Sequence, residues 1–108
     1  MLLGTLQCFS KYDNIEGKWQ AEDNGKIIEI YKDKDGLFYG KDIETGSIMI
    51  KGLRYDSSSQ KYIGKMKPPD KDIELKASMV LIDKDRIKIS IRMFIFSKSM
   101  YLARLKIN

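Results

Sequence analysis

The sequence predicts an all-β protein: a small antiparallel up-and-down barrel of about eight strands. Three observations predict it: apolar and polar residues alternate over several short segments, turn signals recur at short intervals, and no segment has a convincing helical period. Connections this short cannot hold a parallel crossover, so neighbouring strands should be antiparallel. Closing the meander into a barrel removes its open edges.

Strict alternation marks the strands themselves. The clearest segment is RIKISIRMF, in which Ile87, Ile89, Ile91 and Met93 alternate with charged or hydroxyl residues. A period of two places such residues on the dry face of a strand. The same pattern predicts three further dry faces: Ile28 with Ile30; Ile73, Leu75, Ala77, Met79 and Leu81; and Tyr101, Ala103, Leu105 and Ile107.

Turn residues separate these segments. They stand at Asn24-Gly25, Asp35-Gly36, Thr45-Gly46, 56–59, 68–70, 83–85 and 97–99. Glycines also fall inside the middle strands, at Gly40, Gly52 and Gly64. A strand glycine marks a bend or a close approach of another group. In a barrel it can also leave room for a ligand.

Composition excludes several classes of function. The 108 residues form one domain with 43% hydrophobic residues, 32% charged residues and a net charge of +5. Lysines interleave with acidic residues along the chain, which argues against a phosphate-binding stripe, and no nucleic-acid partner is expected. The chain has no histidine, the commonest general base and zinc ligand. We therefore predict no catalytic residues, no metal site and no cofactor, and expect a protein that is not an enzyme.

The two ends of the chain differ in character. Residues 1–12 are apolar without a basic start, and are interpreted either as the remnant of a secretion signal or as a short element packed on the domain. Residues 13–108 form the single barrel domain. No apolar run is long enough to form a membrane-spanning helix.

The stretch Gly17-Lys18-Trp19 at the first strand resembles the signature of lipocalins and other calycins, with Arg104 matching their last-strand arginine. The segments EGKWQAEDNGKIIEIYKDKDGLFYGKD, IKGLRYDSSSQKYIGKM and LIDKDRIKISIRMFI with YLARLK resemble the small bacterial proteins of domain-of-unknown-function family 2147. The resemblance implies a barrel closed at one end by Gly17, Trp19 and Arg104. It also implies export to the periplasm or envelope, with a cytoplasmic location left open.

Two functional hypotheses follow. The first is a non-enzymatic module that binds a small hydrophobic ligand inside the barrel. Its predicted lining is Ile28, Ile30, Tyr62, Met66, Leu75, Met79, Ile89, Ile91 and Leu105. The alternative is an envelope-associated structural or protein-interaction domain with a filled interior. Phe94 and Phe96 form a predicted rim or partner patch in either case, and a monomer or weak dimer is expected.

Overall fold

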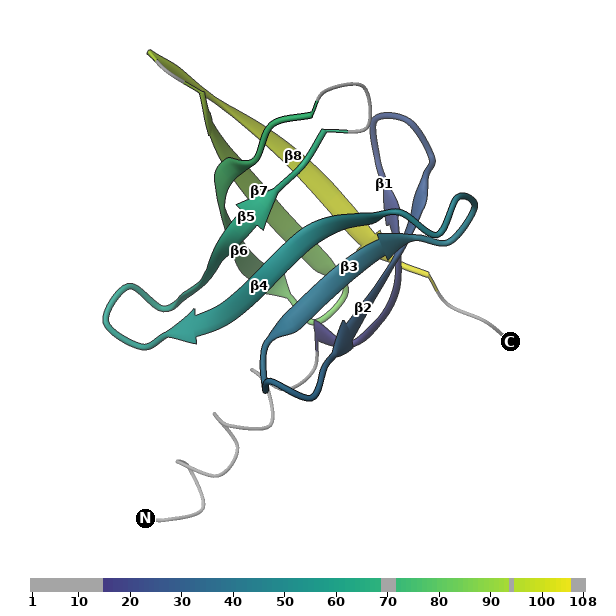
Figure 1. Ribbon diagram of the computed structural model, residues 1–108, viewed down its shortest axis with the longest axis horizontal. Helices are drawn as coiled ribbons and strands as arrows, with labels where there is room; N and C mark the ends of the chain where they lie inside the picture. The colour runs from purple at the N-terminus through teal and green to yellow at the C-terminus, as the bar shows by residue number, and fades with distance from the viewer. Residues whose placement is uncertain (1–14, 69–71, 94, 106–108) are drawn as a thin grey trace.

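Eight strands form a closed antiparallel barrel in the computed structural model, which describes residues 15–68, 72–93 and 95–105 without the side chains of Met93 and Phe96. Each strand pairs with the next, and β8 returns to β1 (Figure 1). The strands are β1 (Gly17–Ala21), β2 (Ile27–Lys32), β3 (Phe38–Asp42), β4 (Ile48–Asp56), β5 (Lys61–Met66), β6 (Leu75–Asp83), β7 (Arg86–Met93) and β8 (Phe96–Arg104). The predicted fold is therefore confirmed.

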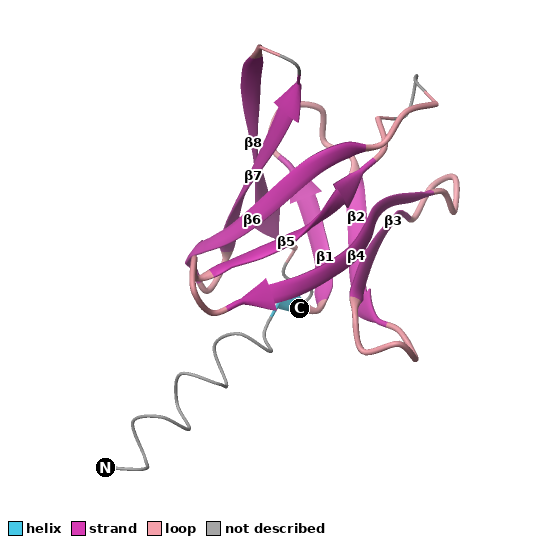
Figure 2. Ribbon diagram, turned by 60° about the vertical axis from the view of Figure 1, so that its left-hand side comes forward, coloured by secondary structure: helices cyan, strands magenta, loops and turns pink. Residues whose placement is uncertain are grey.

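Strand and loop make up nearly all of the described chain (Figure 2). Within that part, no helix has the length and apolar character needed to cross a membrane. The predicted N-terminal segment, residues 1–12, lies outside the described residues.

Neighbouring strands of the barrel pair over unequal lengths. Strand β8 pairs with β7 from Phe96 to Ala103 but with β1 at three residues, Leu102 to Arg104. The described pairing of β7 with β6 stops at Ile91. The end of the β7–β8 hairpin consequently extends past both neighbouring strands (Figure 1).

Apolar side chains from all eight strands fill the interior. The predicted dry faces of β2, β6 and β7 are confirmed at Ile28 and Ile30, at Ala77 and Met79, and at the three isoleucines of β7. The buried apolar residues are Ile15, Trp19, Ala21, Ile28, Ile30, Phe38, Met49, Ile50, Leu53, Tyr62, Met66, Ala77, Met79, Ile87, Ile89, Ile91 and Leu102.

The predicted dry face of the last strand is wrong. Leu102 is fully buried and Met100 packs against the core, whereas Leu105 follows the end of β8, is only partly buried and lies outside the core cluster. Residues paired across two strands share a face, and Trp19 pairs with Arg104. Since Trp19 is buried, Arg104 and Leu102 lie on its side and Leu105 on the other.

The predicted turn at 97–99 is also wrong, because these residues belong to β8. Strand β7 ends at Met93, which pairs with Phe96, so the chain reverses between these two residues and before the predicted turn. The polar run Ser97-Lys98-Ser99 is instead an exposed part of the projecting hairpin.

Two of the strand glycines mark close packing. A Cβ atom added at Gly40 would lie 3.0 Å from Ile50 Cδ1 and 3.2 Å from Ile28 Cγ2. At Gly64 it would lie 2.8 Å from the carbonyl oxygen of Lys51. Strand β4 changes register between Lys51 and Arg54, and this bulge brings its backbone against Gly64. The space beside each glycine is therefore occupied.

These contacts predict unequal costs for adding a methyl group. Gly64→Ala meets backbone and should lower the free energy of unfolding by about 1–3 kcal/mol, the usual range for overpacking. Gly40→Ala meets side-chain atoms of Ile50 and Ile28 at 3.0–3.2 Å and no backbone, so it should cost less. Urea unfolding of both variants beside the wild type measures the difference. Equal stability of Gly64→Ala and wild type would contradict the close approach.

Candidate functional site

Trp19 and Arg104 close one end of the barrel. Trp19 is fully buried, and its indole Nε1 donates a hydrogen bond to the carbonyl of Ile15 at 2.9 Å. The Arg104 guanidinium carbon lies 4.3 Å from the centre of the indole ring. This distance defines a cation–π contact between the guanidinium and the indole.

Arg104 also joins three segments of backbone. Its Nε donates to the carbonyl of Lys84 at 3.0 Å, in the β6–β7 turn, and its Nη1 donates to the carbonyl of Glu16 at 3.3 Å. Its Nε lies 3.5 Å from Asp85 Oδ1. The planar guanidinium can satisfy these acceptors while its face rests on Trp19. The site is therefore a structural clamp between the first and last strands.

Gly17 is needed beside this clamp. Its φ is +130°, a conformation that side-chain-bearing residues rarely adopt. A Cβ atom there would lie 3.4 Å from Arg104 Nη1. The glycine of the G-x-W signature therefore lets the chain enter β1 while the arginine lies against it.

The predicted ligand-lining residues come together in the core. Seven of the nine are buried, and Leu75 packs against them from its partly buried position at the start of β6. Leu105 is the exception described above. The prediction missed Phe38, Ile50 and Leu53, which occupy the interior side of β3 and β4. The bulge in β4 breaks the alternation there, so the sequence pattern offered no clear signal.

The residues that the prediction missed help to fill the barrel interior. The Phe38 ring meets the Tyr62 ring edge-on, with centroids 5.8 Å apart, and Tyr55 meets Tyr62 at 5.2 Å. Such edge-to-face contacts fix aromatic rings in place. Tyr62 of β5 is therefore held between the Phe38 ring of β3 and the Tyr55 ring of β4.

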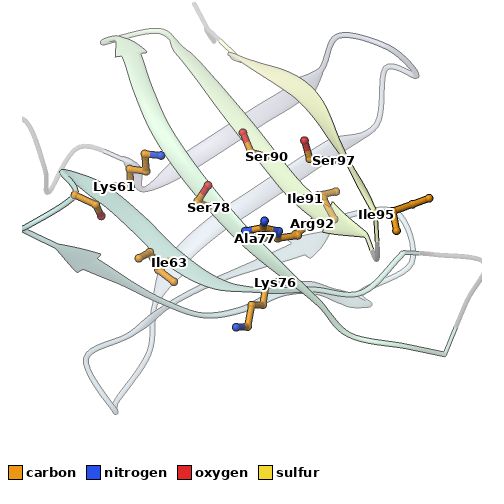
Figure 3. A pocket seen from close by; sticks show the side chains of 11 residues that line it. Lys61, Ile63, Lys76, Ala77, Ser78, Ser90, Ile91, Arg92, Ile95 and Ser97 are labelled. Carbon is orange, nitrogen blue, oxygen red and sulfur yellow. The ribbon is translucent and has the colours of Figure 1, made fainter.

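The largest hollow among the pockets described lies on the outside of β5 to β8, with a volume of about 610 Å³ (Figure 3). We call it the basic groove. Its lining combines three cations, Lys61, Lys76 and Arg92, with hydroxyls and with exposed apolar residues. The complete lining is Ser59, Lys61, Ile63, Lys76, Ala77, Ser78, Ser90, Ile91, Arg92, Ile95 and Ser97.

Among the residues that the structure describes, no carboxylate lines the basic groove. None of its three cations takes part in an ion pair within the described part of the chain. Two acidic residues border the region, but Glu74 pairs with Lys51 at 3.0 Å, and Asp56 accepts hydrogen bonds from Ser58 and Ser59. The described lining of the basic groove is therefore positively charged, although lysines and acidic residues alternate along the sequence.

Asp42 is the buried charged residue of the described structure. It ends β3, where Oδ1 accepts from the amide of Glu44 at 2.9 Å and Oδ2 accepts from Lys26 Nζ at 3.2 Å. These bonds, the first above all, hold the pKa of the Asp42 carboxyl below its usual value. Its backbone bonds to Gly46 and Ser47 span the same turn. This arrangement fixes the β3–β4 turn and links it to the β1–β2 hairpin.

The predicted rim patch cannot be placed in full. Phe94 lies outside the described residues, and the side chain of Phe96 is not described. Ile95, between them, is 94% exposed at the end of the projecting hairpin. Within the described chain, no three His, Cys, Asp or Glu side chains are grouped to hold a metal ion.

Comparison of the chain with protein-family models, curated proteins and solved structures finds no match in any of the three.

The clamp predicts a large loss of stability on truncating its ring. Trp19→Ala should lower the free energy of unfolding by about 3–5 kcal/mol, because removing a large apolar ring opens a cavity in the filled core. Arg104→Ala should cost less, since indole burial survives while a cation–π contribution of about 0.5–2 kcal/mol is lost. Thermal unfolding followed by circular dichroism measures both. Native tryptophan emission should be blue-shifted and poorly quenched by iodide.

Arg86 offers a matched control for Arg104. It lies 4.4 Å from the ring centre of Tyr101, but on the exposed face, where it pairs with Glu22. Arg86→Ala should therefore destabilise the barrel less than Arg104→Ala. If the two arginine variants unfold at the same temperature, closure does not depend on Arg104.

Asp42 predicts a change in the pH dependence of stability. A carboxyl whose pKa is lowered in the folded state favours folding at pH values above its unfolded pKa, about 3.9. This contribution disappears as the pH falls through the folded-state pKa. Asp42→Asn should therefore be less stable than wild type at pH 7, with a gap that narrows below about pH 4. Urea unfolding across this range tests it, with Asp23→Asn in the exposed β1–β2 turn as the control.

Proposed function

We propose that this protein is a non-enzymatic interaction domain with a filled barrel, and that it contacts its partner through its outer surface. The observation that carries the proposal is the packing around Gly40 and Gly64. Two of the three strand glycines that could have left room for a ligand are closely packed: neighbouring atoms come within 3.0 Å of an added Cβ at Gly40 and within 2.8 Å at Gly64, whereas at Gly52, in the β4 bulge, the nearest atom is 3.8 Å away. The outer surface, in contrast, carries an open groove whose cations form no ion pair with the residues that the structure describes.

The rival hypothesis is a hydrophobic ligand inside the barrel. An eight-stranded barrel is at the size where side chains either fill the interior or leave room for one small molecule. The burial of Ile50, Leu53 and Phe38 against the predicted lining favours filling. Under the lipocalin-like resemblance, the Gly17, Trp19 and Arg104 clamp accounts for barrel closure in both hypotheses. Export to the periplasm or envelope remains a proposal that rests on this resemblance alone.

A binding experiment on the interior tests the proposal. The wild type, purified without detergent, should carry no bound small molecule in native mass spectrometry. It should also give no saturable signal with a hydrophobic dye. The Ile50→Ala variant is the positive control, because it removes a side chain that fills the space beside Gly40. A dry apolar cavity of this kind can take up benzene or xenon.

Comparing the wild type with Ile50→Ala decides between a filled interior and a ligand-binding interior. Benzene protection against thermal unfolding in Ile50→Ala, but not in wild type, supports a filled barrel. A ligand copurifying with the wild type at a one-to-one ratio, or a saturable dye site that Met79→Phe blocks, would show that the interior is used.

A further inference from the structure

The strand register places the three cations of the basic groove at the two ends of the groove. Lys76 lies next to Lys65 on β5 and, by continuation of the register, next to Arg92 on β7. Lys61 lies opposite Val80 in the same way, four residues along β6 from Lys76. At about 3.3 Å per residue, the two ends are about 13 Å apart.

Hydroxyl groups occupy the space between these ends. Ser78 pairs with Ser90, and Ser90 with Ser99, so a row of serines crosses β6, β7 and β8. Figure 3 shows Ser78 and Ser90 on the neighbouring strands β6 and β7, and Ser97 on β8, where it pairs with Arg92 at one end of the groove. Lys88, two residues before Ser90 and facing the same side, adds a further cation beside the row.

This surface is chemically suited to a chain of phosphates. Lysine and arginine neutralise phosphate charge, and serine hydroxyls donate hydrogen bonds to phosphate oxygens. One phosphate can meet the cations of one end only, whereas a polymer can meet both ends and the hydroxyls between them. We propose that the basic groove binds a linear phosphate polymer, with Lys76 and Arg92 at one end and Lys61 at the other. This inference rests on the proposed function, since it names the partner of the outer surface.

Two other anionic partners fit the groove less well. Single-stranded nucleic acid is held largely by aromatic rings that stack on its bases, and none of the side chains that the structure describes along the groove is aromatic. A bilayer surface is nearly flat and would meet the borders of a hollow of about 610 Å³ rather than the serines on its floor. A flexible chain without bases can follow the floor.

The test measures binding of fluorescein-labelled inorganic polyphosphate to the full chain by fluorescence anisotropy. Lys76→Gln/Arg92→Gln should weaken binding about 20-fold at 0.1 M salt. It should also make the slope of log affinity against log salt shallower by about 1.4, as expected for two lost phosphate contacts. The matched control is Lys34→Gln/Lys84→Gln, which removes the same charge from exposed turns and should change affinity less than twofold.

Binding to the wild type adds a readout that needs no variant. In NMR titrations with polyphosphate, the amides of Ser78 and Ser90 should shift more than those of the β2–β3 turn. Orthophosphate should compete at least 100-fold less well than the polymer, because it cannot link the two ends.

Several results would overturn the inference. Equal losses in the two double variants would mean general charge attraction, and equal competition by orthophosphate would mean a single-phosphate site. Tighter binding of oligothymidylate than of polyphosphate of equal charge would mean nucleic acid. Groove-dependent binding to phosphatidylglycerol vesicles without polyphosphate binding would mean a membrane surface. A ligand inside the barrel would contradict the proposed function without altering the polyphosphate curves, so the two failures are distinguishable.

Discussion

The contact between Trp19 and Arg104 is the constraint on which the closed barrel depends. The β1–β8 register is short, so few backbone pairs join the first and last strands. The clamp reinforces this seam with a stacked ring, two hydrogen bonds from the guanidinium to backbone carbonyls and a nearby carboxylate. Because one of these acceptors lies before β1 and another between β6 and β7, a single side chain ties together parts of the chain far apart in sequence.

Closure at this seam has a consequence for the rest of the interior. Once the barrel closes with eight strands, its volume is fixed, and its side chains decide whether space remains. Here the β4 bulge brings its backbone against Gly64, while Ile50 and Ile28 cover Gly40. The glycines permit dense packing at the bends of the sheet. This is why the outer surface, and not the interior, is the more promising place for function.

Charged residues are distributed unevenly over the outer surface, and the strand topology explains why. Acidic residues gather mainly in turns or pair with nearby cations, as Glu22 does with Arg86 and Glu74 with Lys51. The outward positions along the paired parts of β5, β6 and β7 carry lysine, arginine, serine and aliphatic residues. Antiparallel pairing places these positions side by side, so charges that are mixed along the sequence become separated on the folded surface. The basic groove results from that separation.

The sequence by itself determined the strand-rich class, the antiparallel order and the inward positions of Ile28 and Ile30 on β2, of Ala77 and Met79 on β6 and of the three isoleucines on β7, although Ile73, assigned to the same face as Ala77, precedes β6 and is exposed. These are local properties: a period of two and the chemistry of short turns. Tertiary structure decided which face of β8 points inward, because that depends on the register with β1 and not on the apolar count of the segment. It also decided that Gly40 and Gly64 are packed against neighbours, and that Lys61, Lys76 and Arg92 line one groove. Each of these requires knowing which strands lie side by side and where a bulge shifts them, and that information exists only in the closed barrel.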